Sequence, residues 1–159
     1  MKLKGFLYVI VGFAVLIFLI SLLMPSSVIT SRSVTINAQP DSIMAQISDL
    51  NNWKNWHPFF KENKSVSQVG DTLKWDNNKL YILGVGKNDV KIYLQNGNGR
   101  PDLNILKVSS GDPSTTVEWN GINYLKWYPW EKFSGIFLNS VVGPGYEKAL
   151  AGLKNYLEK

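Results

Sequence analysis

The sequence predicts an α+β fold in which a curved antiparallel sheet wraps around a long C-terminal helix. One transmembrane helix is predicted before this domain, at the N-terminus. Three observations lead to this prediction. Residues 5–24 carry no charge. Residues 65–124 contain short β-prone runs separated by closely spaced turn signals. After residue 145, apolar residues recur with the 3.6-residue period of an α-helix.

The uncharged N-terminal stretch is long enough to cross a bilayer. Its 20 residues would extend about 30 Å as a helix, which is about the thickness of the hydrocarbon core. A cleaved secretory signal is the alternative, but its apolar region usually spans only about 7–15 residues, and Met24-Pro25-Ser26-Ser27 is a poor cleavage site. We therefore expect a transmembrane anchor at 1–24, a linker at 25–27 and one domain at 28–159.

The charges set the expected orientation and exclude some partners. Lys2 and Lys4 precede the apolar stretch, and the first charge after it is Arg32. The basic side of a span usually stays cytoplasmic, so we expect a cytoplasmic N-terminus and a domain outside the cytoplasm. The formal net charge is +5, and its Lys and Arg residues are scattered along the chain. Nucleic-acid-binding surfaces normally cluster Lys and Arg, so we expect no nucleic-acid partner. The chain has no cysteine, which excludes disulfides and thiolate chemistry.

The domain opens with a predicted strand followed by a helix. Residues 28–36 are rich in Val, Ile and Thr, which favour strands. Pro40 suits the first position of a helix. The apolar spacing of Ile43, Ile47 and Leu50 then predicts a helix of two to three turns.

The next stretch, Asn51-Asn52-Trp53-Lys54-Asn55-Trp56-His57-Pro58-Phe59, is unusually aromatic. Two tryptophans three residues apart share one face of a helical turn. Pro58 ends such a turn at or before His57. We interpret the stretch as a wall packed over one end of the sheet, with Trp53 in the core and Trp56 at a cavity mouth.

The middle of the chain reads as an antiparallel meander, because no helical crossover fits between the runs. The predicted strands lie within residues 73–75, 80–83, 90–94, 103–108 and 115–124. The terminal helix has an apolar face composed of Tyr146, Ala149, Leu150, Leu153, Tyr156 and Leu157. Pro144 suits an early position of this helix. The alternative is one longer helix from about Ser134, kinked at Pro144.

Several motifs together resemble one superfamily. They are Arg32-Ser33-Val34-Thr35-Ile36-Asn37-Ala38, Ile47-Ser48-Asp49-Leu50, Trp53-Lys54-Asn55-Trp56-His57-Pro58, Gly143-Pro144-Gly145-Tyr146-Glu147-Lys148-Ala149-Leu150 and Leu153-Lys154. Over residues 28–158 the chain resembles the START-like, helix-grip (SRPBCC) superfamily, and within it the polyketide cyclase/dehydrase-like group. The resemblance implies an antiparallel sheet of about seven strands wrapped around the terminal helix. It also implies a hydrophobic ligand cavity. It implies no reaction, because this fold hosts binders, transfer proteins and enzymes alike.

Aromatic side chains are the candidate lining of that cavity, although core packing is an equally good explanation for them. The candidates are Trp53, Trp56, Phe59, Trp75, Tyr81, Tyr93, Trp119 and Tyr124. Trp127, Trp130 and Tyr8 are also candidates for anchors at a membrane interface.

Candidate catalytic groups are few. His57 is the only histidine, and without cysteine it cannot build a usual zinc site, so we expect no metal and no cofactor. We interpret His57 as a turn residue rather than a general base, because no partner for acid–base or nucleophilic work lies near it in the sequence. Asp49 is better explained as a cap of the segment that starts at Asn51 or Asn52 than as an acid paired with Glu62.

Three functions are compatible with these features. The first is a membrane-tethered binding module for a hydrophobic small molecule or lipid. The second is a cyclase- or dehydrase-like enzyme with acid and base groups in the same cavity, favoured if His57, Asp49 or Glu118 points into it. The third is a non-catalytic interaction protein whose cavity is filled by side chains. The sequence leaves open whether a reaction is catalysed and how many copies assemble.

Overall fold

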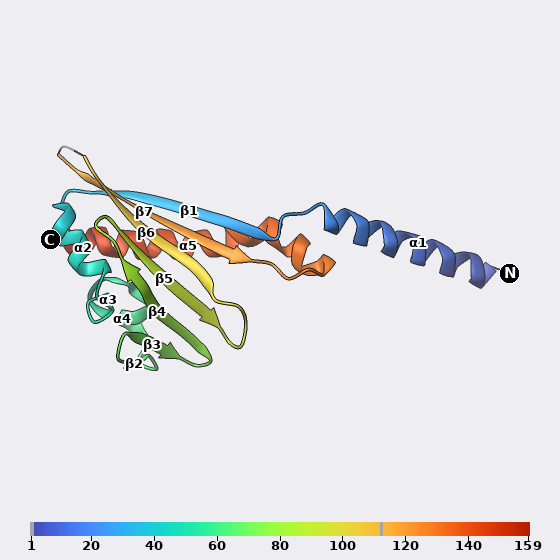
Figure 1. The fold of residues 1–159 in the computed structure, drawn as a ribbon, viewed down its shortest axis with the longest axis horizontal. Coiled ribbons are helices and arrows are strands. Elements are labelled where there is room, and N and C mark those ends of the chain that lie inside the picture. The colour runs from blue at the N-terminus through green and yellow to red at the C-terminus, as the bar shows by residue number, and fades with distance from the viewer. Residues whose placement is uncertain (1, 112) are drawn as a thin grey trace.

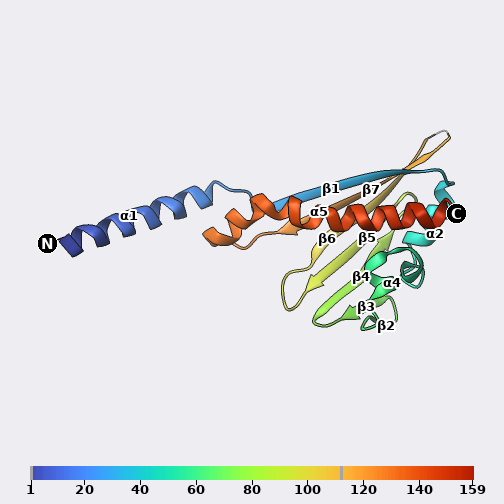
Figure 2. The same cartoon turned by 180° about the vertical axis from the view of Figure 1, so that it is seen from behind.

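The computed structural model describes residues 2–111 and 113–159. A seven-stranded antiparallel sheet curves around one long helix, α5 (Pro129–Leu157), which crosses its inner face (Figures 1 and 2). A separate apolar helix, α1 (Lys2–Leu22), projects from one end of this domain (Figure 1). The predicted α+β architecture is confirmed.

The sheet is a meander, and the first strand of the domain forms one of its edges. Its strands are β1 (Ser27–Ile36), β2 (Ser67–Val69), β3 (Thr72–Trp75), β4 (Asn78–Val85), β5 (Asp89–Asn96), β6 (Asp102–Ser110) and β7 (Thr115–Tyr124). Their order is β1-β7-β6-β5-β4-β3-β2, with antiparallel pairs throughout. The predicted meander is correct, and β1 completes it by pairing along its whole length with β7.

Three short helices connect β1 to β2. They are α2 (Pro40–Ile47), α3 (Trp53–Trp56) and α4 (Pro58–Glu62). His57 is extended, with φ −81° and ψ 115°, and separates α3 from α4. Proline disfavours the helical conformation in the residue before it but suits a first helical position itself. Pro58 therefore ends one helix, as predicted, and starts another, α4, which was not predicted.

The terminal helix is longer than expected. A start at Pro144 is wrong, whereas the alternative of one longer helix through Pro144 is correct, although α5 begins at Pro129 rather than near Ser134 and runs to Leu157. Pro144 has no N–H to donate to the carbonyl four residues earlier, and helices usually bend at such positions; Figure 2 shows that α5 is not straight. Residues buried on both sides of Pro144, among them Gly135 and Tyr146, hold both halves against the domain.

The core lies between α5, the inner face of the sheet and helices α2 to α4. Trp53 is fully buried there. Leu150 and Leu153 on α5 are 2% and 0% exposed, which confirms the predicted buried face of the terminal helix.

Helix α1 contributes little to this core. It is long and apolar enough to cross a membrane, and only 6% of its most apolar window is buried. We predict that the chain without residues 1–24 folds and stays soluble without detergent, because the sheet begins at Ser27. Its circular dichroism melting curve should be cooperative and close to that of the full-length protein in detergent. Recovery of the truncated chain only as aggregate would contradict an independent domain.

A candidate ligand-binding cavity

A cavity of about 340 Å³ lies between α5, the inner face of the sheet and the α3–α4 junction. Small-molecule sites typically span roughly 300–1,000 Å³, so this one is at the small end. Its wall is formed by His57, Phe59, Phe60, Trp75, Leu80, Ile92, Leu94, Asn104, Trp119, Val141, Val142, Gly145 and Tyr146.

The cavity reaches the surface between α4 and α5. Phe59 on α4 and Val141 on α5 both line it, yet they are 42% and 73% exposed. Gly145, one turn after Val141, lines the same opening, and a Cβ atom built there would meet no atom within 4 Å. We call these three residues the mouth.

The inner end of the cavity holds one polar cluster. The Oδ1 atom of buried Asn104 accepts hydrogen bonds from Trp119 Nε1 at 3.0 Å and from the Tyr146 hydroxyl at 2.8 Å. The rings of Trp119 and Tyr146 stack with centroids 4.9 Å apart. Burial, and to a smaller extent the charge of Asp102, raises the pKa of the Tyr146 phenol, which therefore stays a neutral hydrogen-bond donor.

A glycine makes room for this cluster. A Cβ atom at Gly121 on β7 would lie 2.0 Å from the Tyr146 hydroxyl oxygen. Any larger residue would therefore push the Tyr146 ring away from Asn104. Gly121 thus positions Tyr146 without contacting the cavity itself.

His57 lies in the aromatic wall at the α3–α4 junction. Its ring stacks on Trp53 at 5.6 Å and contacts Phe60 at 4.6 Å, measured between ring centroids. Burial lowers the pKa of His57 to about 4, so the ring is neutral near pH 7. Its Nδ1 atom is buried and has no hydrogen-bond partner among the described residues. The expectation of an ordinary turn residue is thus incomplete, because the ring also forms part of the cavity wall.

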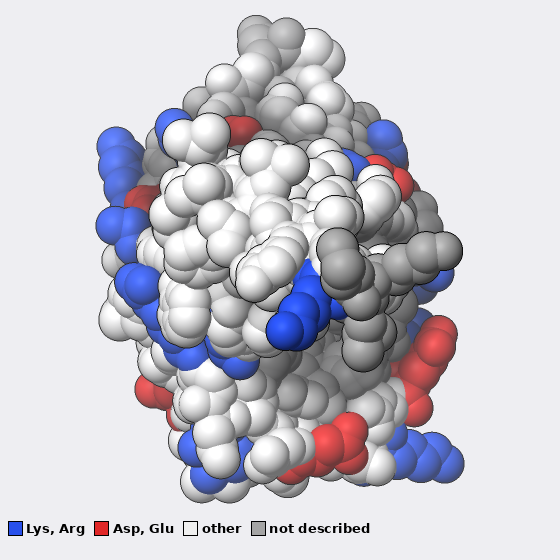
Figure 3. All heavy atoms as spheres, turned by 90° about the vertical axis from the view of Figure 1, so that its right-hand side faces the viewer, with Lys and Arg blue, Asp and Glu red and all other residues white. Residues whose placement is uncertain are grey.

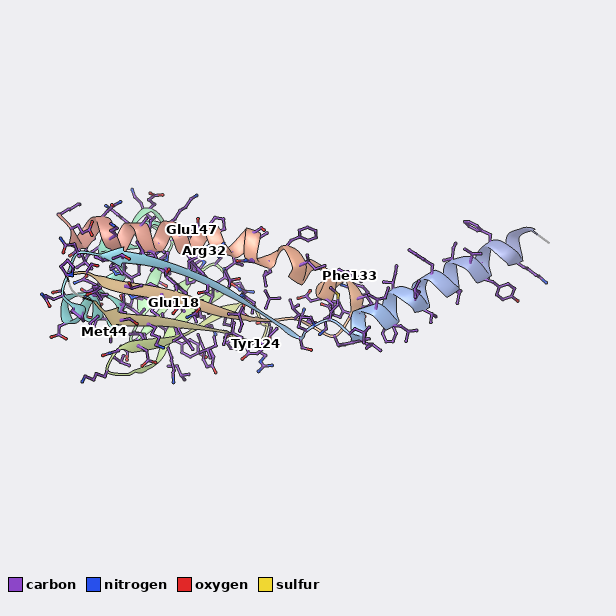
Figure 4. The ribbon with its side chains drawn as sticks, turned by 90° about the horizontal axis from the view of Figure 1, so that it is seen from above. Arg32, Met44, Glu118, Tyr124, Phe133 and Glu147 are labelled. Carbon is purple, nitrogen blue, oxygen red and sulfur yellow. The ribbon has the colours of Figure 1, made fainter. Side chains whose placement is uncertain are left out.

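Charged groups lie elsewhere in the described part of the chain. Asp49 accepts hydrogen bonds from the backbone N–H and the side-chain amide of Asn51, at 2.9 and 2.7 Å, which confirms the predicted cap. Glu118 accepts one from Ser31 Oγ at 3.0 Å on the outer face of the sheet (Figure 4). Among residues 2–111 and 113–159, no Asp, Glu, Lys or Arg lines the cavity. The same residues hold no cluster of His, Asp and Glu suited to a metal ion.

The match to a family model covers residues 27–158, nearly the whole domain. The family is described as polyketide cyclase / dehydrase and lipid transport. The chain belongs to this polyketide cyclase/dehydrase-like family. A search of curated protein sequences gave no match.

Solved structures share the fold of this family member at low sequence identity. An uncharacterised protein from Bacillus thuringiensis is 15% identical, with a TM-score of 0.61 over 83% of this chain and 100% of that one. A START superfamily protein from Mycobacterium smegmatis is 14% identical, with a TM-score of 0.55 over 82% and 97%. The two-domain ARO/CYC protein StfQ of steffimycin biosynthesis is 9% identical, with a TM-score of 0.62 over 83% of this chain and 51% of that one.

Of the predicted aromatic residues, Phe59, Trp75 and Trp119 line the cavity of this cyclase/dehydrase-like domain. Trp53 lies behind the wall, where its ring contacts those of His57 and Trp119. Trp56 does not border the mouth, contrary to the expectation for it. It is 3% exposed and its indole N–H donates to the Gln46 carbonyl at 3.2 Å. The turn of α3 directs both tryptophans into the core, and α4 supplies the mouth residue instead.

The three predicted tyrosines do not reach the cavity. Tyr81 and Tyr93 are cross-strand neighbours on β4 and β5, with ring centroids 5.7 Å apart. Leu80 next to Tyr81, and Ile92 and Leu94 on either side of Tyr93, line the cavity. Successive side chains alternate between sheet faces, so both tyrosines lie on the outer face. Tyr124 lies under the Arg100 guanidinium, 3.7 Å from the ring centroid.

The polar end of the cavity was not predicted from the sequence. Asn104 occupies the buried face of β6 together with Leu106 and Val108. The sequence signal for it was a single amide side chain on a strand face that is otherwise apolar. Such a side chain requires hydrogen-bond partners when it is buried. Tyr146 was predicted as an apolar core residue of the terminal helix. Its hydroxyl gives it a second role at the site.

Proposed function

We propose that this protein is a membrane-tethered binding module for a hydrophobic small molecule or a lipid chain. The observation that carries the proposal is the cavity: an open space of about 340 Å³ within a mostly aromatic and aliphatic wall, reaching the surface at a defined mouth. The lipid-transport part of the family description is consistent with it.

The tether is α1. Its length, composition and exposed surface suit a membrane span. The basic residues Lys2 and Lys4 before it favour a cytoplasmic N-terminus and a binding domain on the other side of the membrane.

The wall favours a neutral ligand. Transfer of a charge into an apolar site without a partner is strongly unfavourable, and the described lining residues carry no charge that could pair with one. The volume suits one small apolar molecule or one hydrocarbon chain. Asn104 and Tyr146 offer a polar contact at the inner end for a hydroxyl or carbonyl group.

The open volume also separates the alternatives. An interaction protein with a filled interior is disfavoured, because Trp and Tyr side chains line this space without filling it. An acid–base enzyme is favoured by one observation, the placement of His57 and Tyr146 in the same wall. His57, neutral near pH 7, would serve as the base. His57→Phe would then abolish turnover of a candidate substrate while a pure binding module would keep its ligand.

A cavity-filling substitution tests the binding proposal. Gly145→Leu adds a side chain at the mouth where a Cβ atom meets no neighbour, and leucine favours a helix more than glycine does. We expect native mass spectrometry of the full-length protein, purified in detergent, to show one bound apolar molecule. Gly145→Leu should reduce the bound fraction several-fold without lowering the melting temperature.

The matched control is Ala151→Leu, which places the same side chain at an exposed position of α5 outside the cavity wall. It should leave the bound fraction unchanged. A wild-type protein that carries no apolar molecule in repeated preparations would contradict the proposal, as would equal losses from both substitutions.

A further inference from the structure

The first half of α5 has an exposed apolar surface. Trp130, Phe137 and Val141 are 70%, 66% and 73% exposed. Their spacing of seven and four residues places them on one face of the helix. Half-buried Phe133 lies near the same face, one turn after Trp130. We call these four residues the α5 stripe.

From Phe133 onward, the stretch of α5 that carries the stripe has no charged residue of its own, and the Arg32 guanidinium contacts its opposite side at Asn139. Residues 133–146 contain no Lys, Arg, Asp or Glu, although the exposed face of a helix is normally charged or polar. In the view along α1, which lies nearest the viewer, most described atoms in the middle are uncharged, one basic side chain lies near the centre, and the other charged side chains lie toward the edge (Figure 3). A contiguous exposed apolar surface of this kind indicates contact with an apolar partner.

One end of the stripe lies beside α1. The ring of Trp127, just before the stripe, packs edge-on against Phe18 of α1 with centroids 6.5 Å apart. The Lys132 ammonium, buried between these elements, donates to the Pro25 carbonyl at 3.0 Å and to Ser26 Oγ at 2.7 Å. Figure 4 shows Phe133 at the end of α5 next to α1. If α1 spans the bilayer, the stripe begins where the chain leaves it.

The other end of the stripe is the mouth of the cavity. Val141 belongs both to the stripe and to the cavity wall, and Gly145 continues the same face. Lys148, one turn further, ends the uncharged surface. The stripe therefore joins the bilayer end of the domain to the opening of the binding site.

The length of the stripe fits one hydrocarbon chain. Trp130 and Val141 are eleven residues apart, which corresponds to about 16 Å along a helix. The hydrocarbon core is about 30 Å thick, so the chains of one leaflet extend about 15 Å. A chain laid along the stripe would therefore reach from the bilayer surface to the mouth.

We propose that the α5 stripe is the path by which a hydrocarbon chain of a bilayer lipid passes between the membrane and the cavity. This inference rests on the proposed membrane-tethered binding function. It adds that the ligand comes from the lipids of the tethering bilayer and avoids exposure to water, because exposure of each apolar group to water is unfavourable.

Photocrosslinking in vesicles tests the path. The full-length protein, with photoreactive benzoylphenylalanine in place of Val141, is reconstituted into phosphatidylcholine vesicles and illuminated. We expect mass spectrometry to find phosphatidylcholine attached at position 141. Phe137→Asp should reduce the adduct several-fold, because a charge on the stripe would have to be desolvated by the chain.

The matched control is Ile136→Asp. Ile136 is adjacent in the chain and 61% exposed, but it lies about 100° around the helix from Phe137, beside the row that Trp130, Phe137 and Val141 form. Both substitutions are at exposed positions and should leave the fold intact. The control should keep the adduct at the unsubstituted level.

The outcomes distinguish this path from the binding function. No lipid adduct at position 141, with an apolar molecule still bound in the purified protein, would overturn the path and leave the binding function standing. Absence of both would overturn both. Equal loss of adduct from Phe137→Asp and Ile136→Asp would overturn the role of the stripe. Crosslinks between two copies of the chain in place of lipid adducts would assign the stripe to a dimer contact and also overturn the path.

Discussion

Replacing Trp53 by alanine is expected to destabilise the domain by about 3–5 kcal/mol, the usual cost of removing a buried tryptophan. Trp53 is fully buried, its ring contacts those of Trp56, His57, Phe60 and Trp119, and its indole N–H donates to the Ile47 carbonyl at 3.1 Å. For a domain of this size the loss corresponds to a melting temperature lower by about 10–20 °C. Thermal denaturation followed by circular dichroism measures it.

The matched control is Trp130→Ala, which removes the same side chain from a position that is 70% exposed. It should change the free energy of unfolding by less than about 1 kcal/mol. Because Trp53 supports the wall residues His57 and Trp119, its loss should also lower ligand occupancy. Equal small effects of the two substitutions would show that the tryptophan turn is not part of the core.

Replacing Leu153 by alanine should cost about 2–5 kcal/mol. Leu153 is fully buried on the face of α5 that packs on the domain. The cost combines the lost burial of the side chain with the cavity left between α5 and its neighbours. Next to Leu153, a Cβ atom at Gly152 would already lie 2.3 Å from the Trp56 carbonyl oxygen. The helix is therefore held too close to α3 to move and fill the space.

The control on the same helix is Ile136→Ala, which truncates a side chain that is 61% exposed. Its effect on the free energy of unfolding should stay within about 0.5 kcal/mol. Chemical denaturation of both variants in the same detergent compares them directly. An unchanged midpoint for Leu153→Ala would place that face of α5 outside the core and contradict the packing of helix on sheet.

The sequence by itself determined the features that depend on local periodicity and on the conformational limits of proline. The apolar spacing around Leu150 and Leu153 identified their helix and its buried face. Turn signals between short β-prone runs identified the meander. Pro40 and Pro58 marked helix boundaries, because the proline ring fixes φ and restricts the residue before it. These signals act within a few residues, so they can be read along the chain.

Only the tertiary structure decided which side chains meet. The sequence left open whether the terminal helix starts at Pro144 or continues through it, and the packing of residues on both sides of the proline decided for continuation. Tyr81 and Tyr93 resemble Trp75 and Trp119 as aromatic strand residues, but their register puts them on the outer face. Asn104 and Tyr146 come together, 42 residues apart in the chain, because β6 and α5 cross at the inner end of the cavity and Gly121 leaves room for the ring. Such contacts depend on strand register and helix placement, which the whole domain fixes cooperatively.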